Sequence, residues 1–463
     1  MAKNATREMT SGSPVKLILS FAVPLLLGML FQQFYSMVDT IIVGKSLGVD
    51  QLAGVGSTGA INFMIIGFCN GVCSGFAIPI AQSFGAKDYK RLRKFVANAA
   101  WLSIAFAAVM TVVVCVLCRQ ILFWMDTPEN IFEYAYSYIF IIFLGIPATY
   151  LYNLLSGIIR SLGDSRTPVI FLVISAMLNI IFDLLAILVL HMGVAGVLFI
   201  VPLHMGVAGA AWATVLSQLI SGILCFLYMR KQYDILRFEK DEIKFEGRQA
   251  IILCNMGIPM GLQYSITAIG SVILQTAVNS LGSQAVAAVT AAGRISGFSC
   301  CPFDALGSTM ATYAGQNVGA GKLDRVGKGL KSASFIGGIY AIIAFFVLSL
   351  FGRQIALLFV SADEIAILDH VKQFLVFNTA FYIPLCLVNT VRFCIQGMGY
   401  SRLAILAGVC EMVGRIIASL VLVPLIGFVG ICLASPIAWI MADLFLVPAY
   451  CHTINRMKKI LAS

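Results

Sequence analysis

Long, continuous apolar segments constrain this sequence more than any other feature. The first runs from Leu17 to Val43, and similar runs of roughly 20–30 residues recur to the end of the chain. Of the 463 residues, 60% are hydrophobic and only 11% are charged. A bilayer can accommodate such a chain if its backbone groups are hydrogen-bonded within helices or a closed barrel. Because the runs do not alternate in polarity, the sequence predicts an all-α membrane protein.

The limits of the apolar runs predict twelve transmembrane helices. We expect them at 14–43, 51–82, 93–118, 131–156, 166–190, 207–229, 249–281, 284–315, 330–350, 367–395, 402–424 and 428–451. The expected order is a tail (1–13), a first lobe (14–229), a linker (230–248), a second lobe (249–451) and a second tail (452–463). An even number of spans places both termini on one side of the membrane.

The positive charges predict which side that is. Most of the 31 Lys and Arg residues fall in the tails and in alternate loops, including the basic linker 230–248. The positive-inside rule therefore predicts cytoplasmic termini in a bacterial inner membrane. This placement also explains the net charge of +10 without a nucleic-acid partner. Membrane lipids are the expected surroundings.

The two halves of the sequence repeat each other at an offset of 234–237 residues. Matching pairs are Pro24 and Pro259, Gln82 and Gln316, Asn153 and Asn389, and Gly163 and Gly399. Six spans separate the copies, so both have the same orientation in the membrane. The sequence therefore predicts two pseudo-symmetric six-helix lobes, related as a parallel repeat, on either side of a central cavity.

A short duplication interrupts the match between the halves. The hexapeptide that begins at His191 recurs at His204. We interpret the extra copy as an insertion in the loop between spans five and six, because loops tolerate added length at small cost.

Two carboxylates, Asp39 and Asp183, lie within apolar runs. An ionised acid at the centre of a membrane helix costs about 2.5–3.5 kcal/mol on insertion scales, so such residues usually mark ion or proton pathways. A polar clamp that holds the first lobe together is the structural alternative. The pattern favours a transporter.

The chain resembles the multidrug and toxic compound extrusion (MATE) transporters of bacteria, in the branch with first-lobe carboxylates. The segments that carry the resemblance are Tyr35–Asp39, Gly44–Gly48, Ala81–Ala86, Arg160–Pro168, Asn179–Asp183 and Gly206–Thr214. The resemblance implies a secondary antiporter that exports cationic amphiphilic drugs or toxic organic compounds by alternating access between two lobes. It implies exchange for inward H+ or Na+, no other cofactor, and no enzymatic activity. A monomer is expected.

The resemblance also implies an ion-coupling site in the first lobe. Its residues would be Asp39, Asn179, Asp183 and Thr214, with Tyr138 as a further member. Oxygen ligands of this kind suit Na+, as they suit other hard cations. Protonation would neutralise the same carboxylates, because desolvation favours their neutral form. The residues alone do not separate the two ions.

Two further sets of residues within the spans each have a functional and a structural interpretation. A substrate cavity could be lined by Gln32, Gln33, Tyr35, Asn153 and Met177, although such residues also serve in packing. A charge network in the second lobe could include Arg294, Asp304, Arg392, Glu411 and Arg415. We favour a structural network over a substrate or proton relay, because paired charges explain how arginines persist in the membrane.

Other classes of protein find less support in the sequence. A lipid-linked oligosaccharide flippase of related fold remains the alternative function, but two first-lobe acids argue against the more cationic cavity expected of it. A membrane-embedded enzyme would need paired catalytic groups, and no such motif occurs. Some MATE transporters carry carboxylates on helices seven and ten, and the corresponding stretches 263–267 and 383–388 have none.

Overall fold

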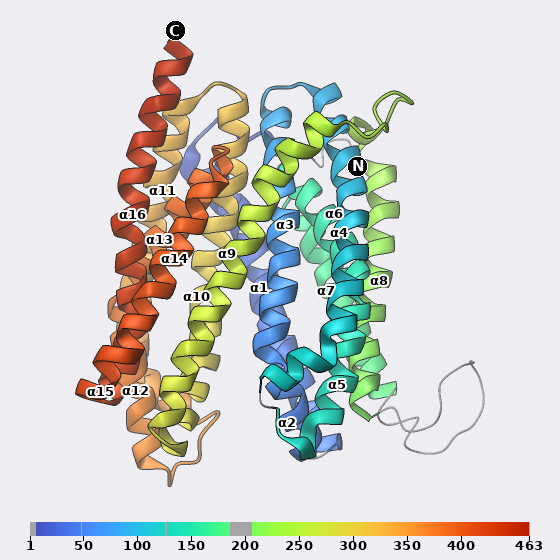
Figure 1. The fold of residues 1–463 in the computed structure, drawn as a ribbon. Helices are drawn as coiled ribbons and strands as arrows, with labels where there is room; N and C mark the ends of the chain where they lie inside the picture. Colours follow the sequence, from blue (N-terminus) through green and yellow to red (C-terminus); the bar gives the residue numbers. More distant parts are fainter. Residues whose placement is uncertain (1–5, 48, 126, 186–205, 463) are drawn as a thin grey trace, which may run out of the picture.

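The computed structural model describes residues 6–47, 49–125, 127–185 and 206–462. Throughout these ranges the chain forms helices joined by short turns, and no strand is present in them. This confirms the predicted all-α fold. In Figure 1 the N-terminal helices, blue to green, stand beside the C-terminal helices, yellow-green to red.

The elements follow the predicted spans closely. The first half contains α1 (Pro14–Leu47), α2 (Val49–Ser57), α3 (Gly59–Gly85), α4 (Tyr89–Trp124), α5 (Glu129–Leu144), α6 (Ile146–Ser161), α7 (Arg166–Leu184) and α8 (Gly206–Gln232). The second half contains α9 (Gly247–Ser280), α10 (Ser283–Gly319), α11 (Leu323–Ala356), α12 (Ile365–Ala380), α13 (Tyr382–Gly397), α14 (Ser401–Ile417), the π-helical turn η3 (Ala418–Leu422), α15 (Val423–Ile426) and α16 (Phe428–Ala462).

These elements account for twelve membrane crossings. In the described residues nine helices are long and apolar enough to cross a membrane, and the bent pairs α5–α6 and α12–α13 raise the number to eleven. The twelfth is α10, which has 37 residues but a less apolar composition that includes Arg294 and Asp304. Most helices extend beyond the predicted limits, because hydropathy marks only the part of a helix that lies in hydrocarbon.

The second predicted span is also divided in the structure. Residues 51–82 do not form one helix, because α2 ends at Ser57 and α3 begins at Gly59. The Thr58 hydroxyl between them donates to the Val55 carbonyl oxygen at 2.7 Å. Gly54, Gly56 and Gly59 weaken the helix on both sides of this point. The second crossing is therefore α3, and α2 packs against α5 instead.

Small residues allow the two lobes to meet closely. A Cβ on Gly75 of α3 would lie 2.4 Å from the Cα of Gly257 in α9. The ends of α3 and α10 show the same contact twice. A Cβ on Gly85 would lie 1.9 Å from the Gln316 carbonyl oxygen, and one on Gly319 would lie 1.8 Å from that of Gln82. Gly85 and Gly319 are repeat equivalents, so the contact has the pseudo-symmetry of the sequence.

This close contact lies at the end of the molecule that carries the chain termini. The described N-terminal residues reach it, since the Met9 amide donates to Oε1 of Gln316 at 2.8 Å. The carbonyl oxygen of Arg7 also lies 1.8 Å from where a Cβ on Gly163 would be, and Gly163 has a φ of +85°. The matching Gly399 has a φ of +97°, so both repeated turns require glycine. The lobes are therefore closed at this end.

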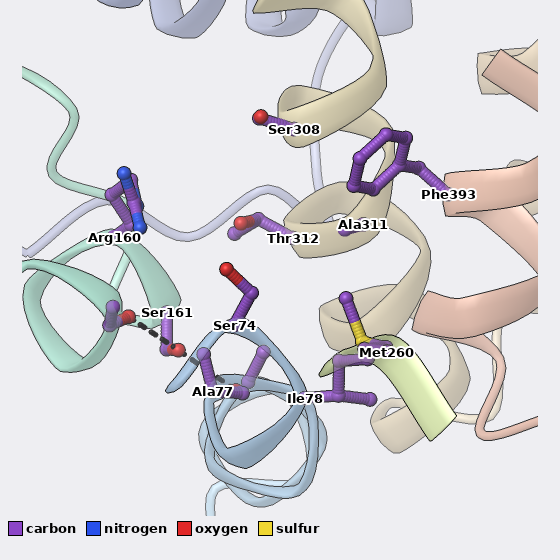
Figure 2. A pocket seen from close by; sticks show the side chains of 12 residues that line it. Ser74, Ala77, Ile78, Arg160, Ser161, Met260, Ser308, Ala311, Thr312 and Phe393 are labelled. Atoms are coloured by element: carbon purple, nitrogen blue, oxygen red, sulfur yellow. Dashed lines mark hydrogen bonds between the residues drawn. The ribbon is translucent and has the colours of Figure 1, made fainter. Parts of the chain in front are cut away.

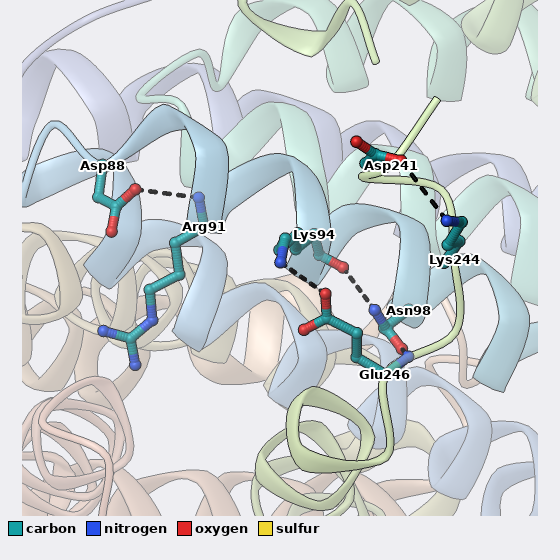
Figure 3. Close-up of polar contacts among 7 residues, drawn as sticks. All are labelled: Asp88, Arg91, Lys94, Asn98, Asp241, Lys244 and Glu246. Carbon is teal, nitrogen blue, oxygen red and sulfur yellow. Dashed lines mark hydrogen bonds and ion pairs between the residues drawn. The ribbon is translucent and has the colours of Figure 1, made fainter. Parts of the chain in front are cut away.

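The stretch between the lobes is bound to α4 at the same end. The buried carboxylate of Glu242 accepts from Nε and Nη2 of Arg93 at 2.6 and 2.8 Å. Glu246 pairs with Lys94 at 2.6 Å, and its amide donates to Oδ1 of Asn98 at 2.8 Å (Figure 3). The hydrogen bond from Arg93 holds the pKa of Glu242 below its usual value, and Lys94 does the same for Glu246.

The duplicated hexapeptides lie mostly outside the described residues. The structure describes only the last of their residues, from Gly206 onward, so their interpretation as a loop insertion stays a prediction.

Candidate functional site

A polar cavity of about 260 Å³ occupies the first lobe. Side chains from α1, α3, α6, α7 and α8 surround it, and the hydrophilic ones are Gln32, Tyr35, Asn70, Thr149, Tyr152, Asn153, Ser156, Arg160, Ser175, Asn179, Thr214, Ser217 and Gln218. So many polar groups inside a membrane domain need water or a ligand as partners. The cavity is therefore the place where a solute can be held in this lobe.

Three of the predicted ion-site residues meet beside this cavity. Asn179 and Thr214 line it, and Asp183 lies one helical turn after Asn179 on α7. Asp183 and Asn179 are almost fully buried. One end of the Asn179 amide lies 3.0 Å from Oδ2 of Asp183, and the other end lies 3.2 Å from Oγ1 and 3.1 Å from the backbone nitrogen of Thr214. The amide thus links a buried acid to the cavity wall.

The neighbours of this amide select its orientation. With Nδ2 of Asn179 toward the carboxylate of Asp183, the amide donates to Oδ2 at 3.0 Å and Oδ1 accepts from the backbone amide of Thr214 at 3.1 Å. In the opposite orientation Nδ2 would face the same Thr214 backbone N–H, and two donors cannot bond to each other. The Thr214 hydroxyl donates to the Ala210 carbonyl oxygen at 3.1 Å. The geometry therefore favours the orientation in which Asn179 donates to Asp183.

The remaining predicted residues of the ion site lie elsewhere or are not described. Tyr138 is partly buried in the core of the first lobe and does not line the cavity. Asp39 belongs to helix α1, but its side chain lies outside the described residues.

Three of the five predicted cavity residues line the cavity, namely Gln32, Tyr35 and Asn153. Gln33 lies beside Gly297 of α10, between the lobes. The prediction for Met177 is wrong, because its side chain is 50% exposed and the cavity is lined by its neighbours Ser175 and Ala176. On helix α7 the residue after Ala176 points away from the face that carries Asn179.

The charge network of the second lobe is smaller than the sequence suggested. Nη1 of Arg392 lies 2.6 Å from Oε1 of Glu411, and Nη2 of Arg415 lies 3.9 Å from Oε2 of the same carboxylate. These three side chains are buried. Arg294 and Asp304 form no ion pair with any residue that the structure describes, although Arg392 is among the charges that act on Asp304. The ion-paired core of the predicted network therefore consists of Arg392, Glu411 and Arg415.

Two glutamines that the sequence analysis did not single out extend this core. Gln263 and Gln396 are buried and lie 2.7 Å apart, amide to amide, across α9 and α13. With its oxygen turned toward Arg392, the Gln263 amide accepts from Nε at 3.2 Å and Nη1 at 3.3 Å. The arginine is thus held on several sides, which fits a structural role.

The comparison with known families decides the class of the protein. The model of the MatE family matches residues 24–185 and again residues 259–421. The chain belongs to the MatE family. The two matches cover well over half of the sequence, and their offset of 235 confirms the internal repeat. The chain is therefore a membrane transporter of the multidrug efflux type and not an enzyme.

Curated relatives and solved structures agree with this assignment. The chain is 29% identical over 353 residues to the probable multidrug resistance protein YoeA of Bacillus subtilis, covering 76% of this chain and 74% of the relative. It is 22% identical over 428 residues to an FAD transporter of Shewanella oneidensis, covering 91% of each. A MATE crystal structure in complex with MaL6 superposes with a TM-score of 0.88 at 22% identity, covering 97% of this chain and 98% of that one.

Proposed function

We propose that the protein exports organic molecules in exchange for an inward flow of H+ or Na+, and that the ion acts at Asp183. The observation that carries this proposal is the contact of Asp183 with Asn179, and of Asn179 with Thr214, at the wall of the polar cavity. An ion that neutralises the buried acid changes the hydrogen bonding of the wall. It thereby couples ion occupancy to the shape and charge of the space that holds the solute.

Asp39 completes the site in this proposal. It lies on α1, whose residues Gln32 and Tyr35 line the same cavity. A second carboxylate near Asp183 would give a sodium ion enough oxygen ligands, or would share protons with Asp183.

The side of the membrane follows from the charges. We infer that the closed end, which carries the described parts of both termini, is cytoplasmic. Arg93, Lys94 and the stretch 233–246 lie at this end, in line with the positive-inside rule. The structure then represents a state closed to the cytoplasm, in the inner membrane of a bacterium. Alternating access would separate the glycine contacts of Gly85 and Gly319 to open that end.

The substrate class rests on the relatives and on the cavity. Similar proteins are named for multidrug resistance and, in one case, for FAD transport. We propose amphiphilic organic compounds, bound within a single subunit, because the cavity lies inside one lobe. The family match favours this function over the flippase alternative.

Dye uptake into inverted membrane vesicles tests the proposal. A pH gradient and a sodium gradient are imposed separately. Vesicles without either gradient provide the baseline. We expect one of the two gradients to drive uptake of a cationic dye, and the ion that does so is the coupling ion. Uptake that needs ATP, or that equilibrates without either gradient, would contradict antiport.

A further inference from the structure

Arg160 occupies an unusual place for a cation. It lies in the last turn of α6 and lines the polar cavity of the first lobe. It also lines a second, smaller cavity of about 50 Å³ that lies between the lobes. Residues of α9, α10 and α13 close this second cavity, among them Met260, Thr312 and Phe393. The guanidinium thus stands at the junction of two internal spaces.

Arg160 has no acidic partner. It forms neither an ion pair nor a hydrogen bond with any residue that the structure describes. The titratable groups close enough to affect it are Tyr152, Tyr264 and Cys73, which are neutral near pH 7. Asp164 lies one turn away in sequence, but its carboxylate accepts from Thr167 and from the Tyr233 hydroxyl instead. An enclosed cation without a counter-charge is costly unless a ligand supplies one.

The smaller cavity offers further donors. The hydroxyls of Ser74, Ser308 and Thr312 line it, and none of the three makes a hydrogen bond to a described residue. Figure 2 shows Arg160 and these hydroxyls around one space, whereas Ser161 is bonded to backbone oxygens. A volume of about 50 Å³ exceeds what one water needs and leaves room for a small oxyanion group.

The internal repeat provides a comparison within the same chain. At the offset of 236 that relates Asn153 to Asn389, Arg160 corresponds to Gln396. Gln396 is buried and hydrogen-bonded to Gln263, so the second lobe places a neutral, satisfied amide at this position. The arginine of the second lobe, Arg392, is paired with Glu411. An unpaired arginine is therefore not a requirement of the shared fold.

We propose that Arg160, with the hydroxyls of Ser74, Ser308 and Thr312, forms a binding site for an oxyanion, either a carboxylate or a phosphate group of the transported molecule. Guanidinium and hydroxyl groups recognise such oxyanions by charge-assisted hydrogen bonds. The inference rests on the proposed function and deepens it, because it adds a cationic group that recognises anions to the cavity that Asn179 and Thr214 also line. Compounds with both a cationic and an anionic group would then be preferred.

A matched pair of dyes tests the inference by equilibrium binding to the purified protein. Rhodamine 123 is a cationic methyl ester, and rhodamine 110 is its analogue with a free carboxylate. Fluorescence polarisation is measured for the wild type, Arg160→Gln, Arg160→Lys and the exposed control Arg166→Gln. Inorganic phosphate is added as a competitor.

We expect Arg160→Gln to weaken binding of rhodamine 110 by about tenfold or more, as for loss of a charged hydrogen bond, and to leave rhodamine 123 within about twofold. Arg160→Lys should retain part of the affinity, and Arg166→Gln should match the wild type. Competition by phosphate for rhodamine 110 alone would place a free anion in the same site. If phosphate does not compete, the site recognises the carboxylate of the dye and not a free phosphate ion.

Equal losses for both dyes, or no loss for either, would overturn the proposal. The binding assay needs no ion gradient. A protein that binds rhodamine 110 through Arg160 but transports neither dye would therefore contradict the proposed antiport and leave the anion site standing.

Discussion

At the scale of single residues, Asn179 has the central position in the ion site. It contacts both Asp183 and Thr214 and so links the acid to the cavity wall. Its amide donates to the carboxylate of Asp183 and accepts from the backbone of Thr214. The sequence indicated that Asn179 and Asp183 share a helix face, but the link to Thr214 depends on how α7 packs against α8.

Asn179→Ala should therefore impair transport more than Thr214→Ala. The first substitution removes the amide that bonds both the buried carboxylate of Asp183 and Thr214, and each lost hydrogen bond costs about 1–3 kcal/mol. The second removes one hydroxyl and keeps the contact with Asp183. Initial rates of gradient-driven dye uptake, normalised to the amount of folded protein, provide the comparison. A Thr214→Ala protein that is inactive beside an active Asn179→Ala protein would reverse this ranking.

Glu411→Gln should lower stability rather than ion coupling. The carboxylate is buried between Arg392 and Arg415, and its loss removes the ion-pair partner of both cations. Removing one partner of such a pair costs about 3–5 kcal/mol. The measurement is the yield of monodisperse protein and its melting temperature. Glu133→Gln is the control, because its pair with Arg119 is exposed and contributes at most about 1 kcal/mol.

The double substitution Glu411→Arg with Arg415→Glu tests the same geometry. It should fail to restore stability, because Arg392 would then face a second cation at the position of Glu411. Full recovery would mean that the pair of Glu411 with Arg415 matters more than the shorter contact with Arg392.

At the scale of elements, the stretch 233–246 is part of the folded structure and not a free tether. The sequence indicated a basic, polar linker. It did not reveal that Glu242 is buried against Arg93, because the partners lie 149 positions apart. Contacts of such separation follow from the packing of α4 beside this stretch, which a hydropathy pattern does not contain.

The attachment of this stretch should weaken in acid. Arg93 lowers the pKa of Glu242, so the attachment is fully present above the ordinary pKa of glutamate and is lost as the pH falls through the lowered value. Hydrogen exchange of residues 233–246, expressed relative to the intrinsic rate of an unstructured chain at the same pH, should therefore accelerate below about pH 4. At neutral pH, Glu242→Gln should accelerate it also, whereas the exposed control Asp241→Asn should not. Unchanged exchange in Glu242→Gln would contradict this role.

At the scale of the whole molecule, the repeat was the most predictable feature. Twelve crossings, two lobes and the offset between them could be read from apolar runs and matching residues. The break between α2 and α3, the outward position of Met177 and the position of Asp304 outside the ion-paired core could not, since each depends on which helix faces lie next to a neighbouring helix. Arg160 lies just beyond the predicted span 131–156, and the sequence does not reveal that the nearby Asp164 bonds to Thr167 and Tyr233 instead.

Closure of the lobes should depend on the paired glycines. Gly85→Ala places a methyl group where the Gln316 carbonyl oxygen lies, so the two lobes must separate at the closed end. Distances between spin-labelled amino acids at positions 88 and 324 should shift to longer values. Gly338→Ala, whose Cβ would meet no atom within 4 Å, is the control and should keep the wild-type distribution. A Gly85→Ala distribution identical to that of the wild type would contradict this closing contact.

The central claim is that the first-lobe acids couple ion flow to export, and one comparison tests it most directly. Dye binding and gradient-driven dye uptake are measured on the same reconstituted samples of the wild type, Asp39→Asn and Asp183→Asn. We predict that both variants bind dye within a few-fold of the wild type but no longer accumulate it in response to either a pH or a sodium gradient. Gradient-driven accumulation at the wild-type level in Asp183→Asn would contradict the account.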